Sequence, residues 1–136
     1  MRRYLLDTSP LAAYLLGRPA AVSLIDPWLD RHEAATSILA YGEVIEYLKD
    51  LPDFPLRRSQ LRQQLQEIRP HLLTYAIVER YTDIRRSMRK PHGTGLIGDV
   101  DTLIAATAME RGLTVVTADR DFTRVPGLAV QLVSLR

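Results

Sequence analysis

Apolar and polar residues follow one another in blocks that predict short buried strands separated by amphipathic helices. Short apolar or β-branched runs predict strands at residues 4–6, 33–36, 72–74, 113–116 and 129–133, the last an edge strand. Apolar residues at helical spacing predict helices at about residues 8–16, 20–30, 37–51, 56–69, 77–90 and 99–111. Such alternation is typical of an α/β fold with a parallel sheet flanked by helices. The connecting loops are short, so residues 1–136 are predicted to form a single domain.

The stretch from Ile97 to Phe122 carries the most information about function. It combines a helix, a left-handed cap at Gly112 and a buried strand, and it has acids at both ends. Asp99 and Asp101 stand where the helix begins, and Asp119 follows the strand. Ligands of open parallel sheets bind at the edge where strands end and helices begin. These acids are therefore candidates for a functional site.

Acids recur at this predicted edge of the sheet in other parts of the chain. The four candidates are Asp7, Glu43, Asp101 and Asp119. With right-handed crossovers, the ends of the first and fourth strands can be neighbours at a topological switch point. Two carboxylates 4 Å apart would repel each other by about 4 kcal/mol at an effective dielectric constant near 20. A convergent cluster would therefore need protons or cations to neutralise it.

The composition favours a hard divalent cation for such a cluster. The chain has no cysteine, and its three histidines, at positions 32, 71 and 92, have no metal-ligand or triad spacing. Carboxylate oxygens alone favour magnesium or manganese over zinc. An ion held in this way can activate water and can stabilise negative charge on a phosphate. The residues therefore point to chemistry on phosphate esters.

Each acid also has a purely structural explanation. Asp7 and Asp119 can cap the helices that follow them, and an acid at position 101 suits the first turn of its helix. Two choices stay open at this level. Glu43 shares a polar helical face with Glu46, and Asp99 is well placed as an N-cap beside Asp101. It is the recurrence of acids at one edge of the sheet that favours a metal site.

Charge and hydropathy narrow the class of partner. The net charge is only +2, so binding to nucleic acid would depend on local clustering of basic residues. Such residues concentrate in the middle of the chain: Arg57, Arg58, Arg62, Arg69, Arg80, Arg85, Arg86, Arg89 and Lys90. They form either a solvated helical surface or a surface that binds a phosphate backbone. No apolar run approaches the roughly 18 residues of a membrane helix, so no membrane association is expected.

One motif is misleading. Residues 93–98 spell GxGxxG and precede a helix, as in a dinucleotide-binding site. They follow a basic run and a proline rather than a strand, and the dinucleotide fingerprint requires the strand. A loop at the helix entry is predicted instead.

Four segments resemble the PIN domain, in particular the VapC-type toxin nucleases of prokaryotic toxin–antitoxin pairs. They are LLDTS at residue 5, TSILAYGEV at residue 36, DVDTLIAATAMERGLTVVTADRDF at residue 99 and VPGLAV at residue 125. The resemblance covers nearly the whole chain and is weakest between Pro52 and His71. It implies a three-layer α/β/α sandwich with a mostly parallel sheet, and a ribonuclease that depends on Mg²⁺ or Mn²⁺.

The resemblance also assigns residues. It places the family's four acids on Asp7, Glu43, Asp101 and Asp119, which selects Glu43 over Glu46 and Asp101 over Asp99. Thr8 and Thr117 match hydroxyl positions beside these acids. By the same resemblance we expect an RNA substrate, an antitoxin partner that blocks the site, a homodimer and a cytoplasmic location.

Two other functions remain to be weighed. A non-catalytic RNA- or protein-binding module can share the same fold, because fold does not fix function. A complete set of four acids argues against a degenerate site. A phosphatase with Asp7 as nucleophile is weaker, because Ser9 stands where the second Asp of the DxDx[TV] motif belongs.

Overall fold

A five-stranded parallel sheet forms the centre of the protein in the computed structural model, which describes residues 1–135. The strands are β1 (Tyr4–Leu6), β2 (Ala34–Ser37), β3 (Arg69–His71), β4 (Thr114–Thr117) and β5 (Val130–Leu132). Their order in the sheet is β3-β2-β1-β4-β5, and every pairing is parallel. β1 therefore lies beside β4, so the predicted neighbourhood of these two strand ends is confirmed. β5 is at the edge, as the sequence predicts.

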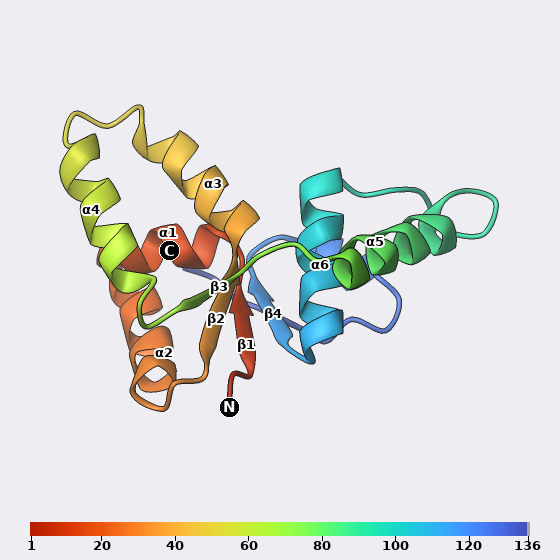
Figure 1. The fold of residues 1–136 in the computed structure, drawn as a ribbon, viewed down its shortest axis with the longest axis horizontal. Coiled ribbons are helices and arrows are strands. Elements are labelled where there is room, and N and C mark those ends of the chain that lie inside the picture. Colours follow the sequence, from red (N-terminus) through yellow and green to blue (C-terminus); the bar gives the residue numbers. More distant parts are fainter. Residues whose placement is uncertain (136) are drawn as a thin grey trace.

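Helices cover both faces of this sheet and give the three-layer α/β/α sandwich that the sequence predicts. The helices are α1 (Thr8–Leu15), α2 (Pro19–Asp30), α3 (Ile38–Leu48), α4 (Phe54–Gln64), α5 (Tyr75–Met88) and α6 (Asp99–Arg111). A 3₁₀ helix, η1 (Arg120–Arg124), follows β4. Figure 1 shows α1 to α4 on one side of the strands and α5 with α6 on the other.

Burial on both faces explains why the central strands contain apolar or small hydroxyl residues and no charged ones. Leu5 and Leu6 of β1 and Val115 and Val116 of β4 are fully buried. Parallel sheets with helices on each face bury both sides of every strand, so alternation of polar and apolar residues disappears. Ile104 of α6 packs in the same core.

The position of the third strand was predicted wrongly. The sequence predicts residues 72–74, whereas β3 is Arg69–His71, and the helix expected over 56–69 ends at Gln64. Leu72 and Leu73 are 64% and 39% exposed and belong to the segment that leads to α5. β3 is an edge strand held by pairing with β2, so its strand conformation does not depend on apolar residues.

Side-chain caps set several helix boundaries. The Ser37 hydroxyl accepts a hydrogen bond from the Leu39 N–H over 3.1 Å, as predicted, and α3 ends at Leu48, three residues earlier than expected. The Thr74 hydroxyl accepts from the Ile77 N–H, so α5 begins at Tyr75 rather than at Ile77. Gly112 ends α6 with φ of +68°, which confirms the predicted left-handed cap.

The glycine-rich segment 93–98 connects α5 to α6 and does not follow a strand, so it lacks the context of a dinucleotide site. A Cβ at Gly93 would lie 2.6 Å from the Met88 backbone, and Gly95 has φ of +124°. These glycines therefore let the loop turn tightly against the end of α5. Among residues 1–135, no helix has the length and apolar character needed to cross a membrane.

Candidate metal centre

Asp7 is the most buried acid of the site. It follows β1 directly, and its backbone N–H donates to the Val116 carbonyl of β4 over 3.0 Å. The Thr117 hydroxyl donates to the Asp7 Oδ2 atom over 2.8 Å. Only 6% of Asp7 is exposed, and its other carboxylate oxygen, Oδ1, is buried without a hydrogen-bond partner. An unpaired buried carboxylate oxygen is costly unless a cation or a proton meets it.

Glu43 reaches the same place from α3. Its Oε1 atom accepts a hydrogen bond of 2.5 Å from the Thr8 hydroxyl, which belongs to the first turn of α1. Thr8 thus holds the Glu43 carboxylate next to Asp7. Glu46, its rival on the same polar helical face, is exposed, whereas Glu43 is half-buried. The solvated-face interpretation therefore applies to Glu46 and fails for Glu43.

Asp101 approaches from the opposite layer, in the first turn of α6. Asp99, its rival, does not cap the helix as predicted, because Gly98 occupies the N-cap position. The Asp99 carboxylate instead accepts hydrogen bonds from Tyr81 and Arg85 of α5. Residues two apart on a helix face different directions, so only one of this pair can point to the strand ends.

Three acids converge at the carboxyl ends of β1 and β4. One carboxylate oxygen from each of Asp7, Glu43 and Asp101 lies within 4.8 Å of the others. The three residues come from three separate elements, and they are the group that could hold a metal ion among residues 1–135. The tertiary structure thus brings together acids that are 36 and 94 positions apart from the first.

The electrostatics of the cluster agree with this geometry. The pKa of Asp101 is raised to about 6, first by burial and then by the neighbouring carboxylates of Asp7, Asp119, Glu43 and Asp121 in that order. Burial also raises the pKa of Asp7, with smaller contributions from Glu43 and Asp119, against the lowering effect of the Thr8 backbone and the Thr117 hydroxyl. The protein alone therefore does not neutralise these acids, and a cation would.

Asp119 lies at the border of the cluster. It is exposed and does not belong to the convergent group of three, although its charge raises the pKa of both Asp7 and Asp101. Its backbone N–H donates to the Thr117 hydroxyl over 3.0 Å, and its carboxylate accepts from the Asp121 N–H over 2.9 Å. The structural interpretation of Asp119 as the cap of η1 is confirmed. A role toward a metal stays a prediction.

Sequence reasoning missed two features near this site. Asp121 is close enough to raise the pKa of Asp101, and its position two residues after Asp119 was the available signal. The cluster of Tyr81, Arg85 and Asp99 has no sequence signal, because these residues meet only where α5 packs on α6.

Comparison with known proteins gives one family. Residues 4–128 match the model of the PIN domain. A similar fold occurs in the structure of VapBC2 from Rickettsia felis bound to a promoter DNA fragment, with 19% identity and a TM-score of 0.83 over 96% of this chain and 98% of that chain. The structure of DNA-bound VapBC from Salmonella typhimurium is similar as well, with 21% identity and a TM-score of 0.82 over 96% of this chain and 98% of that chain. A third similar structure is VapBC-5 from Mycobacterium tuberculosis, with 20% identity and a TM-score of 0.68 over 98% of each chain. No curated protein matches the sequence significantly.

Proposed function

Because the chain belongs to the PIN domain family, we propose that it is a divalent-metal-dependent endoribonuclease of the VapC type, the toxin of a type II toxin–antitoxin pair. The observation that carries this proposal is the convergence of Asp7, Glu43 and Asp101 within 4.8 Å at the carboxyl edge of the sheet. The likeness of the fold to that of VapBC structures supports it. These acids are distant along the chain, and their meeting leaves the buried Asp7 Oδ1 atom without a hydrogen-bond partner.

The residues present fit a hard divalent ion. The ligands are carboxylate oxygens, and the buried Oδ1 atom of Asp7 has no partner in the protein. Mg²⁺ and Mn²⁺ prefer such oxygen ligands and retain several waters when one or a few carboxylates bind them. When bound, the ion would supply an activated water and would stabilise the charge that develops on the phosphate oxygens.

Each residue of the site then has a defined task. Asp7, Glu43 and Asp101 would bind the ion, and Asp119 would support it directly or through water. Thr117 orients the Asp7 carboxylate through its hydroxyl, and Thr8 orients Glu43 in the same way. Such hydrogen bonds from neighbouring groups fix the direction of the ligand oxygens. The protein thus offers a preorganised anionic site at which a phosphodiester can be positioned.

An RNA cleavage assay with Mn²⁺ or Mg²⁺, with and without chelator, tests the proposed activity. Cleavage should depend on the metal and should disappear in Asp7→Asn and Asp101→Asn, with both variants folded by circular dichroism. Equal cleavage in chelator would refute the metal mechanism. Binding of RNA without cleavage in the presence of metal would favour the alternative, a non-catalytic binding module on the same fold.

An antitoxin is proposed as partner, and a cavity next to the acid cluster is the surface we assign to it. This cavity of about 650 Å³ is lined by Thr8, Ala12, Leu16, Val44, Tyr47 and Val133. Thr8 contacts Glu43 directly, so a segment seated in the cavity would cover the entrance to the acids. The lining combines apolar side chains with Ser9, Arg18 and Ser134, and such a mixed surface suits an amphipathic segment. A small gene beside the gene for this protein would be the first candidate to encode it.

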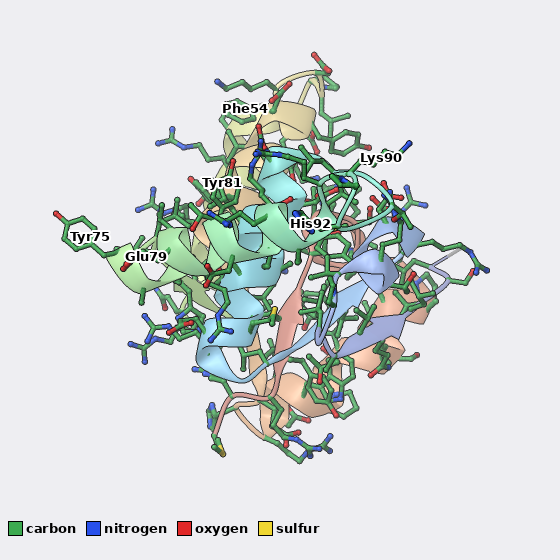
Figure 2. The ribbon with its side chains drawn as sticks, turned by 90° about the vertical axis from the view of Figure 1, so that its right-hand side faces the viewer. Phe54, Tyr75, Glu79, Tyr81, Lys90 and His92 are labelled. Atoms are coloured by element: carbon green, nitrogen blue, oxygen red, sulfur yellow. The ribbon has the colours of Figure 1, made fainter. Side chains whose placement is uncertain are left out.

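A homodimer is proposed on a different surface. Leu72, Leu73, Tyr75 and Val78 are exposed one after another between β3 and the first turns of α5, and Tyr75 is 92% exposed. Figure 2 shows the Tyr75 ring projecting away from the rest of the protein. Several large exposed apolar side chains gathered in one short segment are typical of an interface.

Two substitutions separate these partners. Tyr47→Glu should weaken the complex with the antitoxin and leave the protein a dimer, as judged by its mass in light scattering without antitoxin. Tyr75→Glu should convert the dimer to a monomer and leave antitoxin binding intact. Each variant is the control for the other, and the opposite pattern would exchange the two assigned surfaces. As a nuclease of intracellular RNA, the protein would act in the cytoplasm.

A further inference from the structure

A second charged cluster lies between α5 and the first turn of α6, the turn that also carries Asp101. The Arg85 guanidinium donates through Nη1 to the Asp99 Oδ1 atom, and the Tyr81 hydroxyl donates to the same oxygen over 3.1 Å. The Arg85 Cζ atom also lies 5.5 Å from the centre of the Tyr81 ring. Tyr81 and Asp99 therefore hold Arg85 from two directions.

We propose that Arg85 binds a phosphate of the RNA strand next to the phosphate that reacts, and that Asp99 and Tyr81 hold it in position for this contact. The inference rests on the proposed ribonuclease function and names the residue that positions the substrate at the acid cluster.

The placement of Arg85 follows from α6. Asp99, which anchors Arg85, and Asp101, which belongs to the acid cluster, both lie in the first turn of this helix. One helical turn rises about 5.4 Å, so the backbone of Asp99 lies within one turn of the backbone of Asp101. α5 packs against α6, and Figure 2 shows α5, with Tyr81 labelled, crossing in front of α6. Arg85 is therefore tied to the helical turn that carries Asp101, without belonging to the acid cluster.

The donors of Arg85 are only partly used. A guanidinium has five N–H donors, and Nη1 to Asp99 is the one hydrogen bond that Arg85 makes from its side chain among residues 1–135. Its side chain is 25% exposed, and that of Asp99 is 67% exposed. The remaining donors can thus meet a phosphate that approaches from solvent. A planar guanidinium matches two phosphate oxygens at once.

Other basic side chains are less suited to this task. Arg80 is paired with Glu110 over 3.0 Å in the last turn of α6, at the opposite end of that helix from Asp101. Arg124 donates to the Gly95 carbonyl over 2.8 Å. Arg86 is exposed and has no ion pair or side-chain hydrogen bond within the described part of the chain. A free arginine loses rotamer entropy when it binds phosphate, whereas Arg85 is already ordered by its contacts. A phosphate contact of Arg85 should therefore contribute more to RNA affinity than a phosphate contact of its neighbour Arg86.

The competing explanation is that the pair of Arg85 and Asp99 only fastens α5 to α6. Both explanations predict some loss of stability when Arg85 is replaced. They differ in the dependence of RNA binding on salt, because each phosphate contact to a single strand contributes about 0.7 to the slope of log K against log [salt].

The experiment measures binding of a labelled single-stranded RNA by fluorescence anisotropy between about 50 and 200 mM salt. The protein is the full chain with Asp101→Asn and chelator, so that no cleavage occurs. Arg85→Gln should weaken binding several-fold and reduce the salt slope by about 0.7. Arg85→Lys should keep most of the slope with weaker affinity, and Tyr81→Phe should weaken affinity while the slope is retained. The matched control, Arg86→Gln on the same helix, should change both quantities less.

A lower melting temperature for Arg85→Gln, with affinity and slope equal to those of Arg86→Gln, would overturn the proposal and leave only the fastening role. Absence of RNA binding at every salt concentration would overturn it as well. A failure of the proposed ribonuclease function can be distinguished from a failure of the proposed phosphate contact. If the unmodified protein never cleaves RNA with metal, but Arg85→Gln still reduces the slope, the phosphate contact stands and the nuclease assignment does not. In an active enzyme, Arg85→Gln should raise KM and leave kcat nearly unchanged.

Discussion

Thr117 donates its hydroxyl to the Asp7 Oδ2 atom over 2.8 Å and thereby joins two residues that are 110 positions apart. The same hydroxyl accepts the Asp119 N–H over 3.0 Å. A single buried side chain thus ties the end of β4 to the end of β1 and to the start of η1. It also leaves the other oxygen of Asp7, Oδ1, available for a cation.

Replacement of Thr117 by valine should weaken metal binding and activity by about 10- to 100-fold, the usual effect of removing a group that orients a metal ligand. The loss of the donor also leaves a buried carboxylate oxygen unpaired, which should destabilise the fold by about 1–3 kcal/mol. Titration with Mn²⁺ and urea unfolding measure the two effects. Thr117→Ser, which keeps the hydroxyl, should retain most of the metal affinity and most of the stability. If Thr117→Ser loses as much as Thr117→Val, the effect comes from packing and not from the hydrogen bond.

The metal-free protein should become less stable as the pH rises from 3.8 toward 6. Burial and neighbouring acids raise the pKa of Asp101 from 3.8 to about 6, so in this window the folded state holds a proton that the unfolded chain releases. The raised pKa of Asp7 acts in the same direction. Stability from this source is present at low pH and decreases as pH rises through the window.

Asp101→Asn should therefore be more stable than the unmodified protein at pH 7 without metal, by about 1–2 kcal/mol after allowance for solvent screening of a partly exposed group. Added Mg²⁺ should reverse the order, because only the unmodified site gains binding energy in the folded state. Thermal unfolding of metal-stripped samples at pH 4.5 and 7, before and after addition of Mg²⁺, measures both effects. A flat pH profile in the unmodified protein would contradict the electrostatic account.

Glu43→Gln should abolish cleavage, whereas Glu46→Gln should leave it nearly unchanged. Glu43 is half-buried and bound to Thr8 beside the other acids, and Glu46 is exposed on the same helix. The two substitutions remove the same charge from neighbouring turns, so they control for each other. RNA cleavage with Mn²⁺ is the measurement. The reverse result would mean that the assignment of the helical acid is wrong.

Asp119→Asn should reduce activity by about 10-fold, less than the loss in Asp101→Asn, because its carboxylate lies outside the convergent group and would act through water. Its role as the cap of η1 is preserved by asparagine. Asp121→Asn is the matched control, since Asp121 is exposed two residues away and is not assigned to the ion. A complete loss of activity in Asp119→Asn would mean that the Asp119 carboxylate is a direct ligand. This would require a second ion or a movement of η1.

The sequence by itself determined the α/β class, the elements around Asp7 and Asp101 and the recurrence of acids at one edge of the sheet. These features are local or periodic: Gly112 caps a helix, and Leu113–Val116 is apolar over a strand length because helices cover both faces. The position of β3 was not readable, because Arg69–His71 takes its conformation from pairing with β2, and the more apolar Leu72 and Leu73 remain exposed.

Only the tertiary structure separated Glu43 from Glu46 and Asp99 from Asp101 on physical grounds. Helical periodicity places both glutamates on one polar face, and it cannot tell which layer that face meets. The packing of α3 on α1 and β2 placed Glu43 with Asp7, and Asp101 joins them from α6. The packing of α5 on α6 paired Asp99 with Arg85. Sites assembled from separate elements depend on these distances, which no short stretch of sequence encodes.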